Sequence, residues 1–159
     1  PQGYRTKTLP FVATLTFKIT CVPDVNHLRK IIESPYLPEL FAAITKVQFT
    51  GFHWFSGIAH NRTSNPNLLL CNILPHLQEL TINFHTAGMT ISAWSERDRI
   101  RMENEGNLRR SKQLKVLRMA DVVRKYDLNR IFRCRNISLV RLICWDSAIV
   151  RYHSQNGDP

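Results

Sequence analysis

The sequence predicts an α/β fold in which about five short parallel strands alternate with helices. Two observations lead to this prediction. First, one spacing of apolar residues recurs along the chain: an apolar residue, two free positions, a second apolar residue, one free position and a third. Second, segments with helical features stand between the copies of this spacing. Such an alternation of strands and helices is typical of a parallel sheet with helices outside it.

The repeated spacing predicts strands that each have one apolar face. Its five copies are Val12-Leu15-Phe17, Ile44-Val47-Phe49, Leu77-Leu80-Ile82, Leu114-Leu117-Met119 and Leu139-Leu142-Cys144. Because side chains alternate along a strand, the last two apolar residues of each copy point to the same face. One copy alone cannot bury that face, but copies stacked side by side can. We therefore expect one core to contain these pairs: Leu15 and Phe17, Val47 and Phe49, Leu80 and Ile82, Leu117 and Met119, Leu142 and Cys144.

Helices are predicted in four segments between the copies, at residues 23–35, 65–77, 92–112 and 126–136. The first segment has Pro23 and Asp24 as start signals and Pro35 as a stop signal. The third segment is charged almost throughout, which is consistent either with a helix that carries an exposed insertion or with partial disorder. Three segments carry apolar residues spaced for one helical face: Val25, Leu28, Ile31 and Ile32; Leu68, Leu69 and Ile73; Leu128, Ile131 and Phe132.

The segments LPHLQELTI, QLKVLRM and SLVRLIC resemble the strand segments of leucine-rich repeats, whose pattern is LxxLxL. The uneven distances between them are similar to those in the degenerate repeats of F-box proteins, including small fungal ones. The resemblance implies a short leucine-rich-repeat-like solenoid that forms a single domain over residues 1–159. Its units lie near residues 9–20, 41–54, 74–86, 111–123 and 136–148. The curved sheet of such a solenoid presents a concave face to a protein partner.

The sequence departs from regular leucine-rich repeats and from a true F-box. The Asn or Cys that normally follows the repeat strand is not consistently placed, and His85 and Asp121 stand near its position. A regular asparagine ladder is therefore not expected. The segment LPELFAAI is one residue short of the F-box pattern LPxELLxxI. We therefore assign its apolar residues Leu37, Leu40 and Ile44 to the core of the solenoid.

The composition favours an acidic partner. The formal net charge is +10, from 22 Lys and Arg against 12 Asp and Glu. Such a balance favours contact with an acidic protein, with nucleic acid or with an anionic membrane surface. No transmembrane segment is expected, because no apolar run reaches the roughly 20 residues that span a bilayer.

No enzymatic activity, cofactor or metal is expected. The chain has no Gly-rich phosphate loop, no HExxH or GxSxG motif, and no CxxC pair among its four cysteines. We expect mostly buried thiols, Cys144 among them, and at most one disulfide. The chain is expected in the cytoplasm or the nucleus. Sequons at Asn61 and Asn136 leave secretion open.

The candidate binding site lies on the strand positions that point away from the core. These positions form a polar and basic surface with an aromatic residue at its end, and Trp and Arg are common anchors of protein interfaces. An aromatic segment at residues 50–57, with Phe52, Trp54 and Phe55, is expected to fold back onto the core. The predicted partner-binding residues are Lys18, Gln48, Asn83, His85, Arg118, Arg141 and Trp145.

Two other functions are consistent with the sequence. The first is nucleic-acid binding through a cationic segment that contains Arg97, Arg99, Arg101, Arg109, Arg110 and Lys112. Acidic residues interrupt this segment, so it is not a pure phosphate-binding run. The second is a secreted, effector-like recognition protein with the same fold. A protein partner on the concave face is the leading hypothesis.

Overall fold

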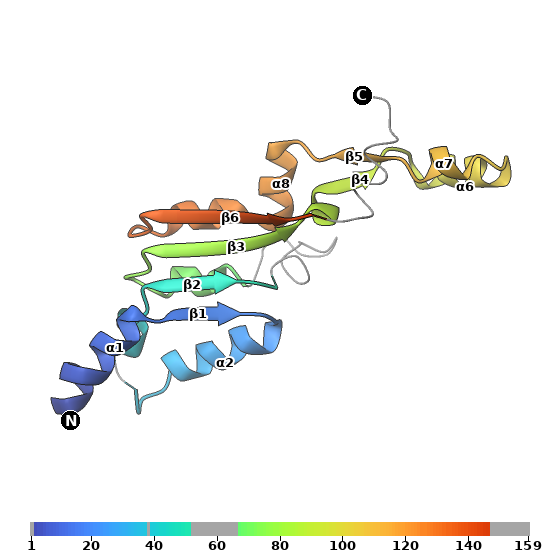
Figure 1. The fold of residues 1–159 in the computed structure, drawn as a ribbon. Coiled ribbons are helices and arrows are strands. Elements are labelled where there is room, and N and C mark those ends of the chain that lie inside the picture. Colours follow the sequence, from blue (N-terminus) through green and yellow to red (C-terminus); the bar gives the residue numbers. More distant parts are fainter. Residues whose placement is uncertain (1, 38, 52–66, 147–159) are drawn as a thin grey trace. The chain divides into compact units, whose positions relative to one another are not determined.

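The computed structural model describes residues 2–37, 39–51 and 67–146, and the chain divides into two compact units (Figure 1). Unit 1 consists of Pro1–Asn83 and Val123–Ile143, and unit 2 of Phe84–Val122 and Cys144–Pro159. The first part of unit 2 is therefore inserted in the sequence between the two parts of unit 1, and the second part of unit 2 follows them. The aromatic segment around Trp54 and the Asn61 sequon lie outside the described residues.

Unit 1 is built around a four-stranded parallel sheet with the order β1-β2-β3-β6 (Figure 1). The strands are β1 (Thr16–Ile19), β2 (Lys46–Phe49), β3 (Glu79–His85) and β6 (Leu139–Trp145). Helical segments separate consecutive strands along the chain, as parallel pairing requires. The prediction of an α/β fold with a parallel sheet and helices is confirmed.

The core of the sheet lies on one face of its two central strands. Val47 and Phe49 on β2 pair in register with Leu80 and Ile82 on β3, and these four side chains are fully buried. The residues between them in the sequence are only half-buried, so burial alternates along each strand. The second and third copies of the repeated spacing therefore form the core that the sequence predicts.

The first copy has a different register from the predicted one. Phe17, and not Leu15, is paired with Val47, and Ile19 is paired with Phe49. Leu15 precedes β1 and is 37% exposed, so its assignment to the core was wrong. The physical reason is that residues 9–14 form a helix, which delays the start of the strand.

Helix α2 (Val22–Ile32) confirms the helix predicted after β1. Its start is fixed by Asp24, whose carboxylate accepts hydrogen bonds from the Thr20 hydroxyl and backbone N–H and from the Cys21 N–H. These bonds, those from Thr20 first, lower the pKa of Asp24 because they favour the charged form. The helix buries Val25, Leu28 and Ile32 and contacts β1.

The remaining helical segments in the described part of unit 1 are short. They are η1 (Tyr4–Thr8), α1 (Leu9–Thr14), α3 (Leu40–Ala43), α5 (Leu69–Asn72) and η3 (Leu128–Arg133), and α8 (Met119–Tyr126) runs from unit 2 into unit 1. Leu40 and Ile44 are buried, as predicted. Ile73 and Phe132 were expected to face the core but are exposed. Ile73 lies just after the end of α5. η3 is a 3-10 helix with three residues per turn, so the buried Leu128 and Ile131 share one face and Phe132 points away from it.

The described part of unit 2 contains an antiparallel pair of strands, β4 (Thr90–Ser92) and β5 (Leu114–Val116), and three helical segments besides the beginning of α8. These are η2 (Thr86–Met89), α6 (Glu96–Asn104) and α7 (Leu108–Ser111). Ser95 caps the start of α6 by accepting the Asp98 N–H. Gly106, with φ of 78°, ends it in a left-handed turn in which Asn107 N–H bonds to Met102 O at 2.7 Å.

The fourth copy of the spacing does not contribute a strand to the parallel sheet. β5 pairs antiparallel with β4, Leu117 and Arg118 follow it outside any strand, and Met119 begins α8. Met119 is 73% exposed. The expectation of a buried Leu117–Met119 pair on a parallel strand was wrong, because residues 90–92 pair with this segment instead.

The fifth copy forms the predicted strand, β6, but its side chains are not buried. Leu142 is 52% exposed and Cys144 is also exposed. Both were expected in the core, and both predictions were wrong because β6 is the last strand of the sheet. All four cysteines are free thiols, but only Cys71 is fully buried, so the expectation of mostly buried thiols was also wrong. Among the described residues, no helix is long and apolar enough to cross a membrane.

Candidate functional site: the polar face of the parallel sheet

The face of the sheet opposite the core carries two rows of polar side chains across the strands. The backbone register aligns Thr16, Lys46 and Glu79 in one row. It aligns Lys18, Gln48 and Thr81 in the next. Because the side chains of one register row lie on the same face, these six residues form a continuous polar surface on unit 1.

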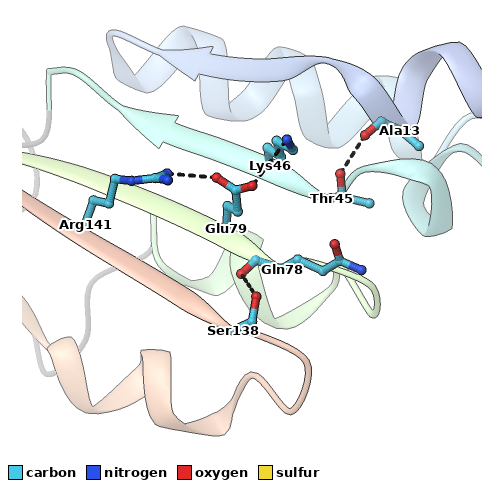
Figure 2. A network of polar contacts seen from close by, with 7 residues as sticks. All are labelled: Ala13, Thr45, Lys46, Gln78, Glu79, Ser138 and Arg141. Atoms are coloured by element: carbon cyan, nitrogen blue, oxygen red, sulfur yellow. Dashed lines mark hydrogen bonds and ion pairs between the residues drawn. The ribbon is translucent and has the colours of Figure 1, made fainter.

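Glu79 is the centre of an ion-pair row on this surface. Its two carboxylate oxygens contact Lys46 Nζ at 3.2 Å and Arg141 Nη1 at 2.8 Å, so one carboxylate joins β2, β3 and β6 (Figure 2). Hydrogen bonds from Arg141 and then Lys46 lower the pKa of Glu79. The carboxylate is therefore ionised at neutral pH, and it pairs with both cations.

A second polar row runs across the starts of the strands. The Thr45 hydroxyl donates to Ala13 O at 2.7 Å, and the Thr45 carbonyl accepts from Gln78 N–H at 2.8 Å. Gln78 O in turn accepts from the hydroxyl and N–H of Ser138 (Figure 2). These hydrogen bonds fix how far each strand is shifted along its neighbour. They therefore fix the register that aligns the charged side chains.

The polar face has a net positive charge. Lys18 is exposed on β1, and Lys46 and Arg141 share the single carboxylate of Glu79. The side chain of Arg141 is 51% exposed, so it keeps donors that can reach a ligand while it is paired. An arrangement of fixed, partly paired cations on a strand surface is suited to carboxylate groups of a partner.

Four of the predicted partner-binding residues belong to unit 1. Lys18 and Gln48 are register partners, and Arg141 lies in the ion-pair row. Asn83 is different: it is 5% exposed, and its Oδ1 is buried without a hydrogen-bond partner in the described part of the chain. The accessible surface of this unit therefore includes Lys18, Gln48 and Arg141.

The other three predicted residues belong to unit 2. His85 accepts the Ala87 N–H with Nδ1 at 3.3 Å. Arg118 pairs with Asp121 at 3.1 Å and lies outside any strand, so its predicted place on a strand of the parallel sheet was wrong. Trp145 is exposed at the end of β6.

Lys46 and Glu79 were not among the residues predicted from the sequence. Each stands directly before the second apolar residue of its copy, Val47 or Leu80, and Arg141 stands directly before Leu142. Aligning the copies by this position would have shown opposite charges in one row. The charge of the residue at this position of each copy is therefore the sequence feature that indicates the ion-pair row.

Cysteine and metal chemistry offer no competing site in the described residues. Burial raises the pKa of the thiols of Cys71 and Cys134, so both are protonated at neutral pH. No group of three or more His, Cys, Asp or Glu side chains in the described ranges is placed to hold a metal ion.

Comparison of the chain with protein-family models, with curated proteins and with solved structures found no match.

Proposed function

We propose that the chain is a non-enzymatic, leucine-rich-repeat-like solenoid module that binds an acidic protein partner through the polar face of its parallel sheet. The observation that carries this proposal is the ion-pair row in which Glu79 holds Lys46 and Arg141. A binding surface built on strands is held more precisely than one built on loops. Extended sheet surfaces of repeat proteins serve as binding sites.

The charge balance supports an acidic partner. One carboxylate, that of Glu79, serves two cations, and Lys18 adds a third positive charge on the same face. A carboxylate of a partner can bind a cation of this row without burying an unpaired charge. The four free cysteines support action in a reducing compartment, the cytoplasm or the nucleus.

A site-specific photo-crosslinking experiment tests the proposal. A photoreactive amino acid replaces Thr16, which is exposed on the polar face, or Lys30, which is exposed on α2. In an extract of cells that express the chain, we expect a discrete protein adduct from position 16 and none from position 30. The adduct should resist nuclease treatment.

A matched pair of charge reversals provides the control. Lys18→Glu and Lys30→Glu change the net charge equally and replace exposed residues. Lys18→Glu should reduce the adduct at position 16 about threefold or more, as an interfacial charge reversal does. Lys30→Glu should leave it unchanged. Equal adducts from both positions, or equal effects of both reversals, would contradict the proposal.

Nucleic-acid binding by unit 2 is the second candidate. The feature that favours it is the exposed arginine series of α6 and α7, including Arg97 and Arg99. Arg101 pairs with Asp98, and Arg110 stacks on the Trp94 ring at 5.0 Å, so part of this charge is engaged within the unit. Steeply salt-dependent binding to random-sequence RNA, lost in the double variant Arg97→Glu/Arg99→Glu, would favour this function.

A further inference from the structure

In the part of the chain that the structure describes, the outer edge of β6 is an open strand edge. β6 is the last strand in the order β1-β2-β3-β6, and no strand within residues 2–37, 39–51 and 67–146 pairs with its outer side (Figure 1). All seven residues of β6 are exposed. Natural sheets usually protect such edges with short strands, charged side chains or Pro, because the unpaired backbone groups are a template for another strand.

The geometry identifies the backbone groups that point outward. The Leu139 N–H donates to Gln78 O at 3.1 Å, so Leu139 directs its backbone toward β3. The direction of the backbone groups alternates along a strand, as the direction of the side chains does. Val140 and Leu142 therefore direct their N–H and C=O groups to the outer edge, where an added strand would bond to them.

The side chains of β6 are apolar on both faces of the sheet. Arg141 contacts Glu79 and so lies on the polar face, together with Leu139 and Ile143. Val140 and Leu142 lie on the opposite face. All four apolar side chains are between 37% and 52% exposed. An added strand would cover apolar surface on both faces at once, which a ligand of the polar face alone would not do.

The neighbourhood of this edge in unit 1 is strongly basic. The segment Val123–Ile143 contains Asp127 as its one acidic residue and carries these cationic residues: Arg124, Lys125, Arg130, Arg133, Arg135 and Arg141. Arg130 pairs with Asp127. Arg133 and Arg135 are exposed, and they lie six and four residues before Leu139, the first residue of β6.

We propose that β6 binds an extended, acidic segment of a partner protein as an additional strand of the sheet. Backbone bonds to Val140 and Leu142 give affinity, alternate apolar residues of the segment cover the exposed side chains, and its carboxylates pair with Arg133 and Arg135. A second copy of this chain fits the edge less well, because pairing β6 with β6 brings two basic segments together. This edge is distinct from the polar face described above.

The test uses two labelled, end-blocked nine-residue peptides with the full chain. In one peptide, valine alternates with glutamate; in the other, valine alternates with lysine. We expect the glutamate peptide to bind about tenfold more tightly at low salt, since complementary charge favours it. It should slow hydrogen exchange at the Val140 and Leu142 amides. A lack of protection at both amides at saturating peptide would overturn the proposal.

Backbone recognition is tested by comparing Leu142→Pro with Leu142→Ala. Both variants remove the leucine side chain, but only proline removes the outward N–H, and proline is tolerated at this position of an edge strand. Leu142→Pro should bind the glutamate peptide about tenfold more weakly than Leu142→Ala, because a backbone bond is lost. Circular dichroism checks that both variants are folded. Equal peptide affinities in two folded variants would overturn the proposal.

If Leu142→Pro does not fold, a variant with two surface substitutions tests the charge recognition instead. Arg133→Glu/Arg135→Glu should bring the two peptide affinities to within about twofold of each other. Lys30→Glu reverses an exposed charge on α2, which contacts β1, and should leave the preference for the glutamate peptide unchanged. A preference that survives the double variant would contradict the proposed charge recognition. Sedimentation that shows a dimer dissociated by Leu142→Pro would assign the edge to a second copy and overturn the proposal.

Discussion

β3 and β6 are neighbouring strands of equal length in one sheet, but their surroundings differ. β3 has β2 on one side and β6 on the other, and Leu80 and Ile82 are fully buried. β6 has a neighbour on one side only in the described structure, and Leu142 is half exposed. The two strands carry the same spacing of apolar residues. Burial therefore depends on the number of neighbours that a strand has as well as on its own side chains.

The difference also separates two roles within one sheet. A strand with neighbours on both sides contributes mainly to stability, because its apolar side chains and its backbone groups are already satisfied. A strand at the edge keeps apolar surface and backbone groups that another molecule can use. In unit 1, β3, which mainly stabilises the sheet, therefore lies next to β6, which another molecule can reach.

The comparison is tested most strongly at Leu80. Leu80→Ala should lower the free energy of unfolding by about 2–5 kcal/mol, because it leaves a cavity between buried side chains. The measurement is chemical denaturation followed by circular dichroism. A loss below about 1 kcal/mol would place Leu80 in a site that relaxes easily, and would contradict the packed core.

Hydrogen exchange tests the alternation of backbone direction along β6 in the free chain. The Leu139 amide is bonded to Gln78 O, whereas the Val140 and Leu142 amides point outward. We expect the Leu139 amide to exchange about tenfold more slowly than the two outward amides, since a paired amide must open first. Equal protection of all three amides in the monomeric chain would show that the outer edge is already covered.

Leu142→Ala provides the matched counterpart of Leu80→Ala. The same side-chain atoms are removed, but Leu142 is 52% exposed, so the loss of stability should be below about 1 kcal/mol. The same denaturation experiment measures it. If the two variants lose equal stability, β6 is covered in solution and the contrast between the strands fails.

The smallest expected effect concerns the pH dependence of the ion-pair row. The pKa of Glu79 is lowered in the folded chain, so its pairing stabilises the fold above the ordinary pKa of 4.5. This stabilisation is lost as the pH falls through the lowered folded pKa. Glu79→Gln should therefore reduce stability at pH 7 and have little effect well below pH 4.5.

Denaturation at several pH values checks this prediction. Glu33→Gln removes an exposed carboxylate at the end of α2 and serves as the control for the loss of one negative charge. If the two variants show the same pH dependence, the row between Lys46 and Arg141 does not stabilise the fold.

Local patterns predicted several elements of unit 1 well. The start signals at Pro23 and Asp24 and the apolar spacing after them predicted α2, because a helix start is determined by residues close in sequence. The pairs Val47–Phe49 and Leu80–Ile82 predicted two central strands for the same reason. Lys18 and Gln48 were expected to point away from the core, and the observed register aligns them in one row.

The wrong predictions concern the pairing of strands that are far apart in the sequence. The spacing Leu114-Leu117-Met119 fits a strand, but whether its partner is a parallel strand or β4 depends on residues far away in the sequence. The apolar pattern of β6 likewise does not contain the information that this strand has one neighbour in the described part of the sheet. Leu15 fits the spacing by chance, since a helix occupies the residues before it. A pattern of side chains specifies a strand, whereas its neighbours are a property of the whole chain.

The insertion of unit 2 between β3 and β6 has a consequence for the order of assembly. Thr45 and Ala13, which join the first two strands, are 32 residues apart, and Ser138 and Gln78 are 60 residues apart. During synthesis, β1, β2 and β3 are made before most of unit 2 and before β6. We therefore expect a nascent chain in which β3 is temporarily the open edge, with its apolar residues available to chaperones until β6 arrives.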